Sequence, residues 1–274
     1  MYLFVYDQDS LPRAIKPQKK NSQFHFLGTV SGPTYAELRH SKSTSTTECL
    51  PFFIESSNIT IQFDNDNPVN SKVSGSRSNS ILRYQLEVCA EGNIQECLYQ
   101  YVIENHSSPL IPYIVYQYLS NKTDFESLYA LYTLIDGDAT HTFHYRKLTQ
   151  RLNSLKKLSV GSKLPSFTFI DQHGNKVLSD TLPDNVNYLA LLVGASWCSQ
   201  CDNAYSQLNT NFPDMKISTI DINRQPKMWD SPVINSLAVD HIPFIILLAP
   251  DGTIMSYDIR VWEVKTSSFE KTNN

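Results

Sequence analysis

Residues 187–201 read NYLALLVGASWCSQC, and this stretch decides the fold of the chain. Its first part, residues 188–193, is continuously apolar, which is typical of a strand buried on both faces in a parallel sheet. Three small residues break the run, and Cys198 and Cys201 follow with two residues between them. We therefore predict a buried strand that turns into a helix carrying a dithiol or disulfide couple.

Strands and helices alternate on both sides of this stretch, beyond a domain boundary near residue 160. The predicted strands are residues 167–170, 188–193, 217–222, 244–248 and 254–258, with helices from Cys198 and near residues 232–238. This alternation predicts an α/β sheet. The Asp251-Gly252 turn joins the last two strands as a hairpin.

The chain before residue 160 divides into three segments with different residue patterns. Residues 1–21 carry two prolines and a small basic group, and we expect a leader or flexible N-terminus. Residues 22–79 are β-rich, with alternation such as that of residues 58–63, and predict a small β-sheet or sandwich module. Residues 80–159 show apolar residues at helical spacing and predict a helical connector to the domain at 160–274.

Composition excludes several classes of protein. The 274 residues are 41% hydrophobic and 18% charged, which indicates a globular protein. The net charge of −4 is spread along the chain, so nucleic acid is not an expected partner. No apolar run reaches membrane-spanning length, and residues 1–6 are too short for a secretory signal, so no signal is visible in this sequence.

Five cysteines are too few, and odd in number, for a disulfide framework. Cys89 and Cys97 would lie roughly 12 Å apart on one helix, beyond disulfide reach. Only a turn at residues 91–93 could join them, so buried free thiols are favoured, and no pairing is predicted for Cys49. His141 and His144 lack ligand-spaced partners, which favours surface or half-buried histidines over a metal site.

The motif Trp197-Cys198-Ser199-Gln200-Cys201, with Ile242-Pro243 farther on, resembles the thioredoxin fold. More narrowly, the chain is similar to the TlpA/ResA branch of exported thiol–disulfide oxidoreductases over about residues 160–257. The supporting residues are Val160, Gly161, Pro165, Phe167, Asp171, Gly174 and the run 242–254. The upstream part is similar to a β-rich domain of unknown function that often precedes such folds in Gram-negative bacteria, through residues 28–30, 53–55, 58–61 and 75–76 with Asn79.

The predicted chemistry is thiol–disulfide exchange. Cys198 lies near a helix N-terminus, where a thiol pKa falls, and would be the nucleophile. Cys201, one turn on, would resolve the mixed disulfide. The resemblance implies that Pro243 is a cis-proline, that the backbone of Ile242 pairs with an extended substrate, and that Trp197 shields the dithiol.

The resemblance also implies the setting of this chemistry. The expected partners are protein disulfides or dithiols and an upstream electron donor, with no cofactor and no metal. The expected location is the periplasm or cell envelope of a Gram-negative bacterium. The direction of exchange and the reduction potential stay open, because Ser199-Gln200 differs from the common intervening dipeptides.

Three departures from the pattern favour a different class of function. Ala204 stands where the branch carries Glu, Leu192 where thioredoxin has a buried Asp, and Ser206 where a proline is expected. The chain therefore lacks both of the carboxylates that could accept the proton of the resolving thiol. The rival hypothesis is a non-catalytic binding or assembly module with a vestigial dithiol.

The cysteine pair itself is also compatible with roles outside redox exchange. A structural disulfide and half of a zinc site both fit two cysteines at this spacing, although no second ligand pair stands at zinc spacing. A peroxidase fails its motif, because Leu191 and Ala195 stand where peroxiredoxins need Pro and Thr or Ser.

Overall fold

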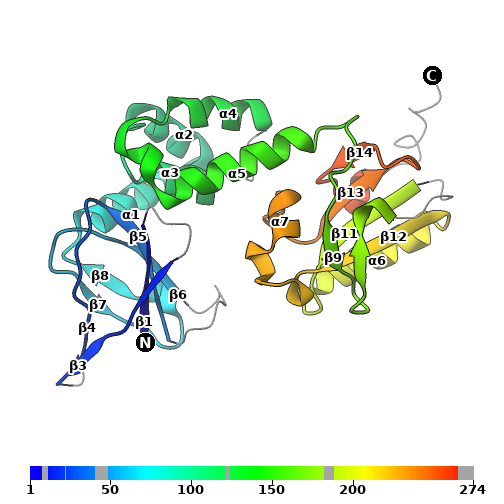
Figure 1. The fold of residues 1–274 in the computed structure, drawn as a ribbon. Helices are drawn as coiled ribbons and strands as arrows, with labels where there is room; N and C mark the ends of the chain where they lie inside the picture. The colour runs from blue at the N-terminus through cyan, green and yellow to red at the C-terminus, as the bar shows by residue number, and fades with distance from the viewer. Residues whose placement is uncertain (8–11, 22, 41–48, 121–123, 182–187, 265–274) are drawn as a thin grey trace. The chain divides into compact units, whose positions relative to one another are not determined.

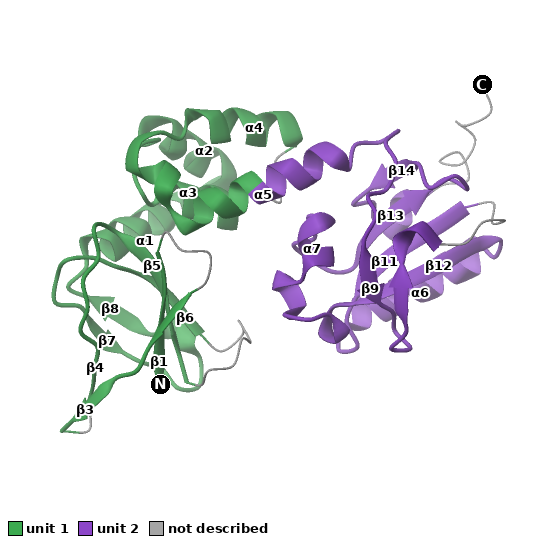
Figure 2. Ribbon diagram, viewed as in Figure 1, with its two compact units in different colours: residues 1–149 green, residues 150–274 purple. Residues whose placement is uncertain are grey.

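The computed structural model describes residues 1–7, 12–21, 23–40, 49–120, 124–181 and 188–264 (Figure 1). Asn187, at the start of the stretch 187–201, lies outside them. The chain forms two compact units, Met1–Thr149 and Gln150–Asn274 (Figure 2). The division falls inside helix α5 (Phe143–Lys157), ahead of the boundary predicted at residue 160.

An antiparallel sheet of four strands, in the order β2-β1-β5-β6, forms the base of the N-terminal unit, with hairpins β3-β4 and β7-β8 beside it. Its strands are β1 (Tyr2–Tyr6), β2 (Arg13–Ile15), β3 (Gln18–Lys20), β4 (Gln23–His25), β5 (Thr34–Arg39), β6 (Cys49–Ile54), β7 (Thr60–Gln62) and β8 (Lys72–Ser74). Alternate residues of β1, β5 and β6 form an apolar cluster that includes Val5, Ala36 and Phe52. The predicted β-sheet module followed by helices is confirmed.

The prediction of a leader at residues 1–21 is wrong for its described part. Tyr2–Tyr6 form β1, which pairs with β2 on one side and with β5 on the other. Val5 is fully buried there. Five apolar residues are too few to show a period, and the partner strand β5 lies far along the chain, so local sequence did not reveal this strand.

Helices follow the sheet in the described part of the first unit. They are α1 (Arg77–Ala90), α2 (Ile94–Glu104), α3 (Ile111–Ile114), α4 (Phe125–Leu134) and α5. The Ser76 hydroxyl caps α1 and the Asp124 carboxylate caps α4, each accepting a hydrogen bond from a backbone N–H three residues on. Within the described ranges, no helix is both long enough and apolar enough to cross a bilayer.

Cys89 and Cys97 form a disulfide with their Cα atoms 5.4 Å apart, which corrects the prediction of free thiols. α1 ends at Ala90, and Asn93 begins α2 by accepting hydrogen bonds from its first backbone N–H groups. The turn between the two helices therefore brings the cysteines within disulfide reach. Cys49 is a buried thiol.

His144 is buried, contrary to the surface or half-buried position predicted for it. The rings of Tyr35, Tyr113 and Phe143 contact its imidazole edge-on, with centroids 4.5–5.0 Å apart. Burial lowers the pKa of His144 to about 3, so the ring is neutral. His144 thus belongs to an aromatic core, and the described residues hold no group of three His, Cys, Asp or Glu suited to a metal ion.

The C-terminal unit is built on a sheet in the order β12-β11-β13-β14, with hairpin β9-β10 beside it. Its strands are β9 (Thr168–Ile170), β10 (Lys176–Leu178), β11 (Tyr188–Gly194), β12 (Met215–Asp221), β13 (Phe244–Leu248) and β14 (Ile254–Tyr257), and its helices beyond α5 are α6 (Ser199–Asn211) and α7 (Pro232–Ser236). β11 runs parallel to β12 and antiparallel to β13, which pairs with β14 as the predicted hairpin.

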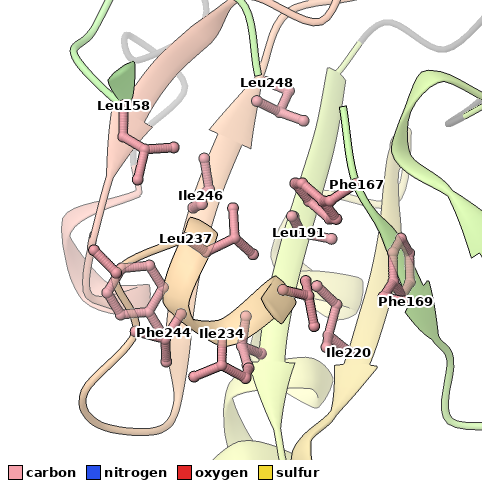
Figure 3. Close-up of a cluster of buried hydrophobic side chains, with 14 of the residues drawn as sticks. Leu158, Phe167, Phe169, Leu191, Ile220, Ile234, Leu237, Phe244, Ile246 and Leu248 are labelled. Carbon is pink, nitrogen blue, oxygen red and sulfur yellow. The ribbon is translucent and has the colours of Figure 1, made fainter. Parts of the chain in front are cut away.

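Both faces of this sheet are buried, as the continuous apolar run of β11 predicts. Leu191 and its alternate neighbours pack with Ile220, Ile234 and Phe244 on one face (Figure 3). Ala190 and Leu192 pack on the other face with the apolar side of α6. A parallel pair, an antiparallel hairpin and a dithiol helix after the central strand make this a thioredoxin-like α/β unit, as predicted.

Candidate active site

Strand β11 and helix α6 position the two cysteines. β11 ends at Gly194, and Cys198 is the N-cap residue of α6. The backbone N–H of Cys201 donates a hydrogen bond to the Cys198 sulfur, with N and Sγ 3.1 Å apart. A helix N-terminus offers unpaired N–H groups and a positive dipole end, so a reduced Cys198 is favoured there as its thiolate.

Cys198 and Cys201 are joined as a disulfide, with Cα atoms 5.2 Å apart. Both residues are buried. Gly194 lies directly against the second one, because a Cβ atom placed on Gly194 would come within 3.3 Å of the Cys201 sulfur. A Cβ atom at the end of β11 would therefore crowd Cys201, and glycine avoids this contact.

Ile242 and Pro243 lie beside this disulfide. Ile242 packs against a small cluster formed by Ala195, Cys198 and Cys201. The bond between Ile242 and Pro243 is cis, as predicted. Strand β13 begins at the next residue. The sheet therefore holds one side of the loop, while Ile242 contacts the cysteines.

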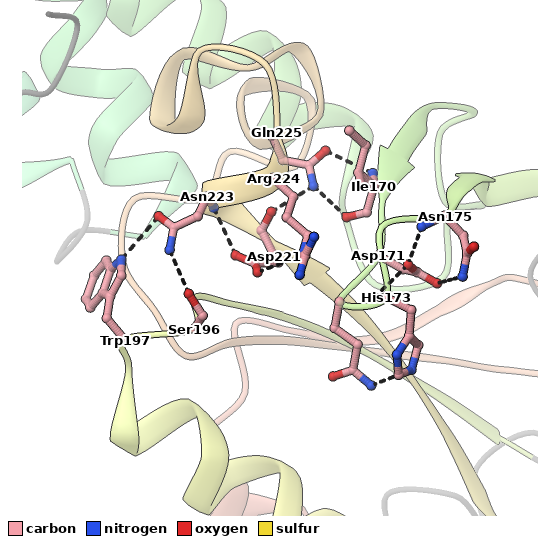
Figure 4. A network of polar contacts seen from close by, with 11 residues as sticks. Ile170, Asp171, His173, Asn175, Ser196, Trp197, Asp221, Asn223, Arg224 and Gln225 are labelled. Carbon is pink, nitrogen blue, oxygen red and sulfur yellow. Dashed lines mark hydrogen bonds and ion pairs between the residues drawn. The ribbon is translucent and has the colours of Figure 1, made fainter.

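Trp197 projects from the turn, and 63% of its surface is exposed. Its indole N–H donates to the side-chain oxygen of Asn223 at 3.2 Å (Figure 4). The amide of Asn223 in turn donates to the Ser196 hydroxyl at 3.1 Å. Asn223 thus fixes the turn before Cys198 from two points, a link that sequence reasoning did not find.

Asp221, the last residue of β12, is a second residue that the sequence analysis missed, and only 8% of it is exposed. Its Oδ1 accepts a hydrogen bond from the Asn223 N–H at 2.9 Å, and its Oδ2 lies 3.4 Å from Nε of Arg224. One signal was available. Parallel strands bring their carboxyl ends to one edge of a sheet, so Asp221 had to end near Gly194.

A cavity of about 430 Å³ adjoins the buried side of Cys201. Its polar and titratable lining includes Asp202 and Tyr205 from α6, Asp221 at the end of β12, Arg224 after it, and Gln172 from the β9-β10 turn. Leu192 and Ala204, where related patterns place carboxylates, are buried apolar residues on the α6 side of the sheet. The cavity therefore takes its charge from other positions.

Gln225 ties the β9-β10 hairpin to this site. Its side-chain oxygen accepts from the backbone N–H of Ile170 at 3.0 Å, and its amide donates to the Ile170 carbonyl at 2.6 Å. The same amide donates to the Asp221 carbonyl at 2.8 Å. Gln225 is buried, so these bonds are shielded from water and hold β9 against the end of β12.

A charged cluster lies next to Ile242. The Nδ1 atom of His241 is 2.7 Å from Oδ1 of Asp240, and its Nε2 is 3.1 Å from Oδ1 of Asp258. Hydrogen bonds to Asp240 and Asp258 raise the pKa of His241 to about 9. Arg151 of α5 pairs with the other Asp240 oxygen at 2.5 Å. His241 is therefore a cation at neutral pH, placed one residue before Ile242.

Three solved structures similar to this chain come from Bacteroides. A thioredoxin-like protein of Bacteroides caccae is 18% identical over 67% of this chain and 77% of its own, with a TM-score of 0.37. The thioredoxin domain of a thiol-disulfide oxidoreductase of Bacteroides vulgatus is 22% identical over 38% of this chain and 90% of its own, with a TM-score of 0.30. A thiol:disulfide interchange protein of Bacteroides sp. is 24% identical over 38% of this chain and 84% of its own, with a TM-score of 0.30.

No curated protein matches the chain. The N-terminal part does match a family. Residues 3–82, which span the sheet of the first unit and the start of α1, match the model of the family described as "Domain of unknown function (DUF4369)".

Proposed function

We propose that this protein is a thiol–disulfide oxidoreductase that reduces, or exchanges, disulfides of other proteins through Cys198 and Cys201. The observation that carries the proposal is the Cys198–Cys201 pair at the N-terminus of α6, in contact with Ile242. A helix N-terminus lowers the pKa of a thiol, and a second cysteine one turn on can reach the same sulfur. These two properties are what thiol–disulfide exchange requires.

In the proposed reaction the reduced Cys198 thiolate attacks one sulfur of a substrate disulfide. A mixed disulfide forms, and the other substrate sulfur leaves as a thiolate that takes up a proton. Cys201 then attacks the Cys198 sulfur, which restores the Cys198–Cys201 disulfide and releases the second substrate thiol. Two electrons pass from the enzyme dithiol to the substrate disulfide. An upstream dithiol donor reduces the enzyme for the next cycle.

Trp197, Ile242 and Pro243 are the proposed substrate-binding residues. Trp197 is exposed next to Cys198 and offers an apolar surface to a polypeptide. The backbone at Ile242 would pair with an extended substrate strand, as in β-strand addition. Pro243 would set the direction in which that backbone faces the two sulfurs.

The proposed setting is the periplasm or cell envelope. The Cys89–Cys97 disulfide in the first unit supports it, because such bonds persist in oxidising compartments and are rare in the cytosol. Its substrates would then be envelope proteins. The residues Leu192 and Ala204 favour the rival function, a non-catalytic binding or assembly module, since neither carries a carboxylate.

Dithiothreitol-coupled reduction of insulin separates the two functions. Wild type is compared with Cys198→Ser, and the matched control is the Cys89→Ala/Cys97→Ala double variant, which removes a disulfide far from the site in sequence. We expect Cys198→Ser to show only the background rate of dithiothreitol, and the control to match wild type. A wild-type rate no faster than that of Cys198→Ser would exclude the oxidoreductase and leave the binding module.

A further inference from the structure

The buried thiol of Cys201 poses a proton problem. In the resolving step this thiol must lose its proton, yet burial in apolar surroundings raises a thiol pKa. Cys201 lies against Gly194 and Ile242, with the apolar Ala204 one turn farther along α6. An acceptor near Cys201 is therefore needed for fast resolution at neutral pH.

Asp221 lies on the same face of the sheet as Cys201. In the parallel β11–β12 pair, Val193 stands opposite Ile220, and Gly194 stands opposite Asp221. Val193 and Ile220 both point into the core on the α7 side. Because successive residues of a strand point to opposite faces, the Asp221 side chain points to the α6 side. The adjacent strand is about 4.8 Å from Gly194, which itself touches Cys201.

The cavity beside β11 joins the two side chains. Cys201 and Asp221 both line it, and its volume of about 430 Å³ is far above what one water molecule needs. Water in this cavity can therefore relay a proton from the Cys201 sulfur to the carboxylate. The other titratable or charged residues of its lining are Asp202, Tyr205 and Arg224.

Two contacts hold the Asp221 carboxylate in place. The Asn223 N–H binds Oδ1, and the Arg224 guanidinium lies near Oδ2 and offsets part of the negative charge (Figure 4). A carboxylate accepts several hydrogen bonds, so each oxygen retains a lone pair for water. Asp221 is thus both anchored and able to accept a proton.

We propose that Asp221 is the proton acceptor for Cys201 in the resolving step, in place of the carboxylates missing at positions 192 and 204. The Cys201 thiol gives its proton to Asp221 through water in the cavity that both residues line. The resulting thiolate attacks the Cys198 sulfur and displaces the substrate thiolate, which takes up the proton. In the reverse direction, protonated Asp221 returns the proton to Cys201. This inference rests on the proposed oxidoreductase function.

Single-turnover reaction of the reduced protein with dithionitrobenzoate, an aromatic disulfide, separates the two steps. Attack by Cys198 releases the first nitrothiolate, and resolution by Cys201 releases the second. We expect Asp221→Asn, which retains an oxygen for the Asn223 N–H, to slow the second phase about 100-fold at neutral pH and to leave the first unchanged. The matched control Asp202→Asn removes a carboxylate from the same cavity and should alter the second phase less than about threefold.

The conditions of the second phase give a further test of Asp221. In Asp221→Asn the second phase should recover when a small base such as imidazole is added as an external proton acceptor, whereas in wild type the added base should change it little. A second phase that is equal in wild type and Asp221→Asn would overturn the inference. A first phase in wild type no faster than in Cys198→Ser would instead overturn the proposed function.

An equilibrium measurement keeps the inference testable without turnover. In Cys198→Ser, the remaining thiolate of Cys201 is followed by its ultraviolet absorbance against pH, with and without Asp221→Asn. A nearby carboxylate disfavours a second anion, so its removal should lower the pKa of Cys201. An unchanged pKa for Cys201 would place Asp221 out of reach and contradict the proposal, while thermal unfolding of each variant verifies that the fold is intact.

Discussion

The two disulfides of this chain differ in the helix ends that they join: Cys89–Cys97 links the end of α1 to the first turn of α2, whereas Cys198–Cys201 lies entirely at the start of α6. Cys89 is in the last turn of α1, where the dipole is negative and a thiolate is disfavoured. Cys198 caps the first turn of α6, where the dipole is positive and a thiolate is favoured. The Cys89–Cys97 bond joins two consecutive helices, whereas Ile242 contacts the cluster of Cys198 and Cys201, and Cys201 lines a cavity of about 430 Å³.

This difference teaches that spacing alone does not assign a role to a cysteine pair. Each bond closes a short stretch of chain, with sequence separations of 8 and 3. The surroundings decide whether the sulfurs are exchanged or remain bonded. The Cys89–Cys97 bond links two consecutive helices, whereas the Cys198–Cys201 bond has the surroundings that the proposed redox role requires.

Removing the Cys89–Cys97 bond should have the largest effect of the following predictions, and the effect should be on stability. By loop-closure entropy, Cys89→Ala/Cys97→Ala should lose about 2.5 kcal/mol of unfolding free energy, or about 70-fold in the unfolding constant. The three tryptophans, Trp197, Trp229 and Trp262, all belong to the second unit. Denaturant unfolding should therefore shift in far-ultraviolet circular dichroism, with little shift in tryptophan fluorescence. Coincident shifts in both signals would contradict a link confined to the first unit.

Raising the pH should weaken the second unit through His241. Its pKa in the folded protein, about 9, exceeds the value near 6.5 of an unfolded chain. The stabilisation is therefore fully present below about pH 6.5 and is lost as the pH rises through 9. Partial exposure limits it to roughly 2 kcal/mol.

To test this prediction, the free energy of unfolding is measured at several pH values between 6 and 10, with tryptophan fluorescence as the signal. His241→Gln should remove the loss of stability across this window, while Cys89→Ala/Cys97→Ala should retain it. A wild-type stability that is flat over the window would contradict the charge cluster around His241.

Alkylation compares the two pairs most directly and has the smallest expected effect. After full reduction, Cys198 should react with iodoacetamide at pH 7 about tenfold faster than Cys89, because the N-terminus of a helix favours a thiolate and its C-terminus disfavours one. Mass spectrometry of peptides from quenched samples gives both rates in one sample. Equal rates would mean that the helix ends do not distinguish these cysteines.

Much of the second unit could be predicted from sequence because its signals are local. The apolar run before Cys198, the cysteine spacing and the Asp251-Gly252 turn each act within a few residues. The cis bond before Pro243 was predicted from family resemblance and is present. The roles of Trp197 and Ile242 in substrate binding stay predictions.

The missed features depend on residues far apart in the chain. β1 was missed because its five residues alone do not indicate that it pairs with β5. The Cys89–Cys97 bond required knowing that α1 ends at Ala90. The closeness of Asp221 to the cysteines follows from the register that sets it opposite Gly194. The two residues belong to neighbouring strands, β12 and β11, which α6 separates in the sequence.

The missing side chain of Gly194 also has a kinetic consequence. A Cβ at this position would crowd Cys201, and its absence leaves the Cys201 sulfur in the place where it bonds that of Cys198. A group held so near competes with thiols in solution as if it were present at very high concentration. A mixed disulfide on Cys198 should therefore be short-lived, and small thiols such as glutathione should not accumulate there as a cap.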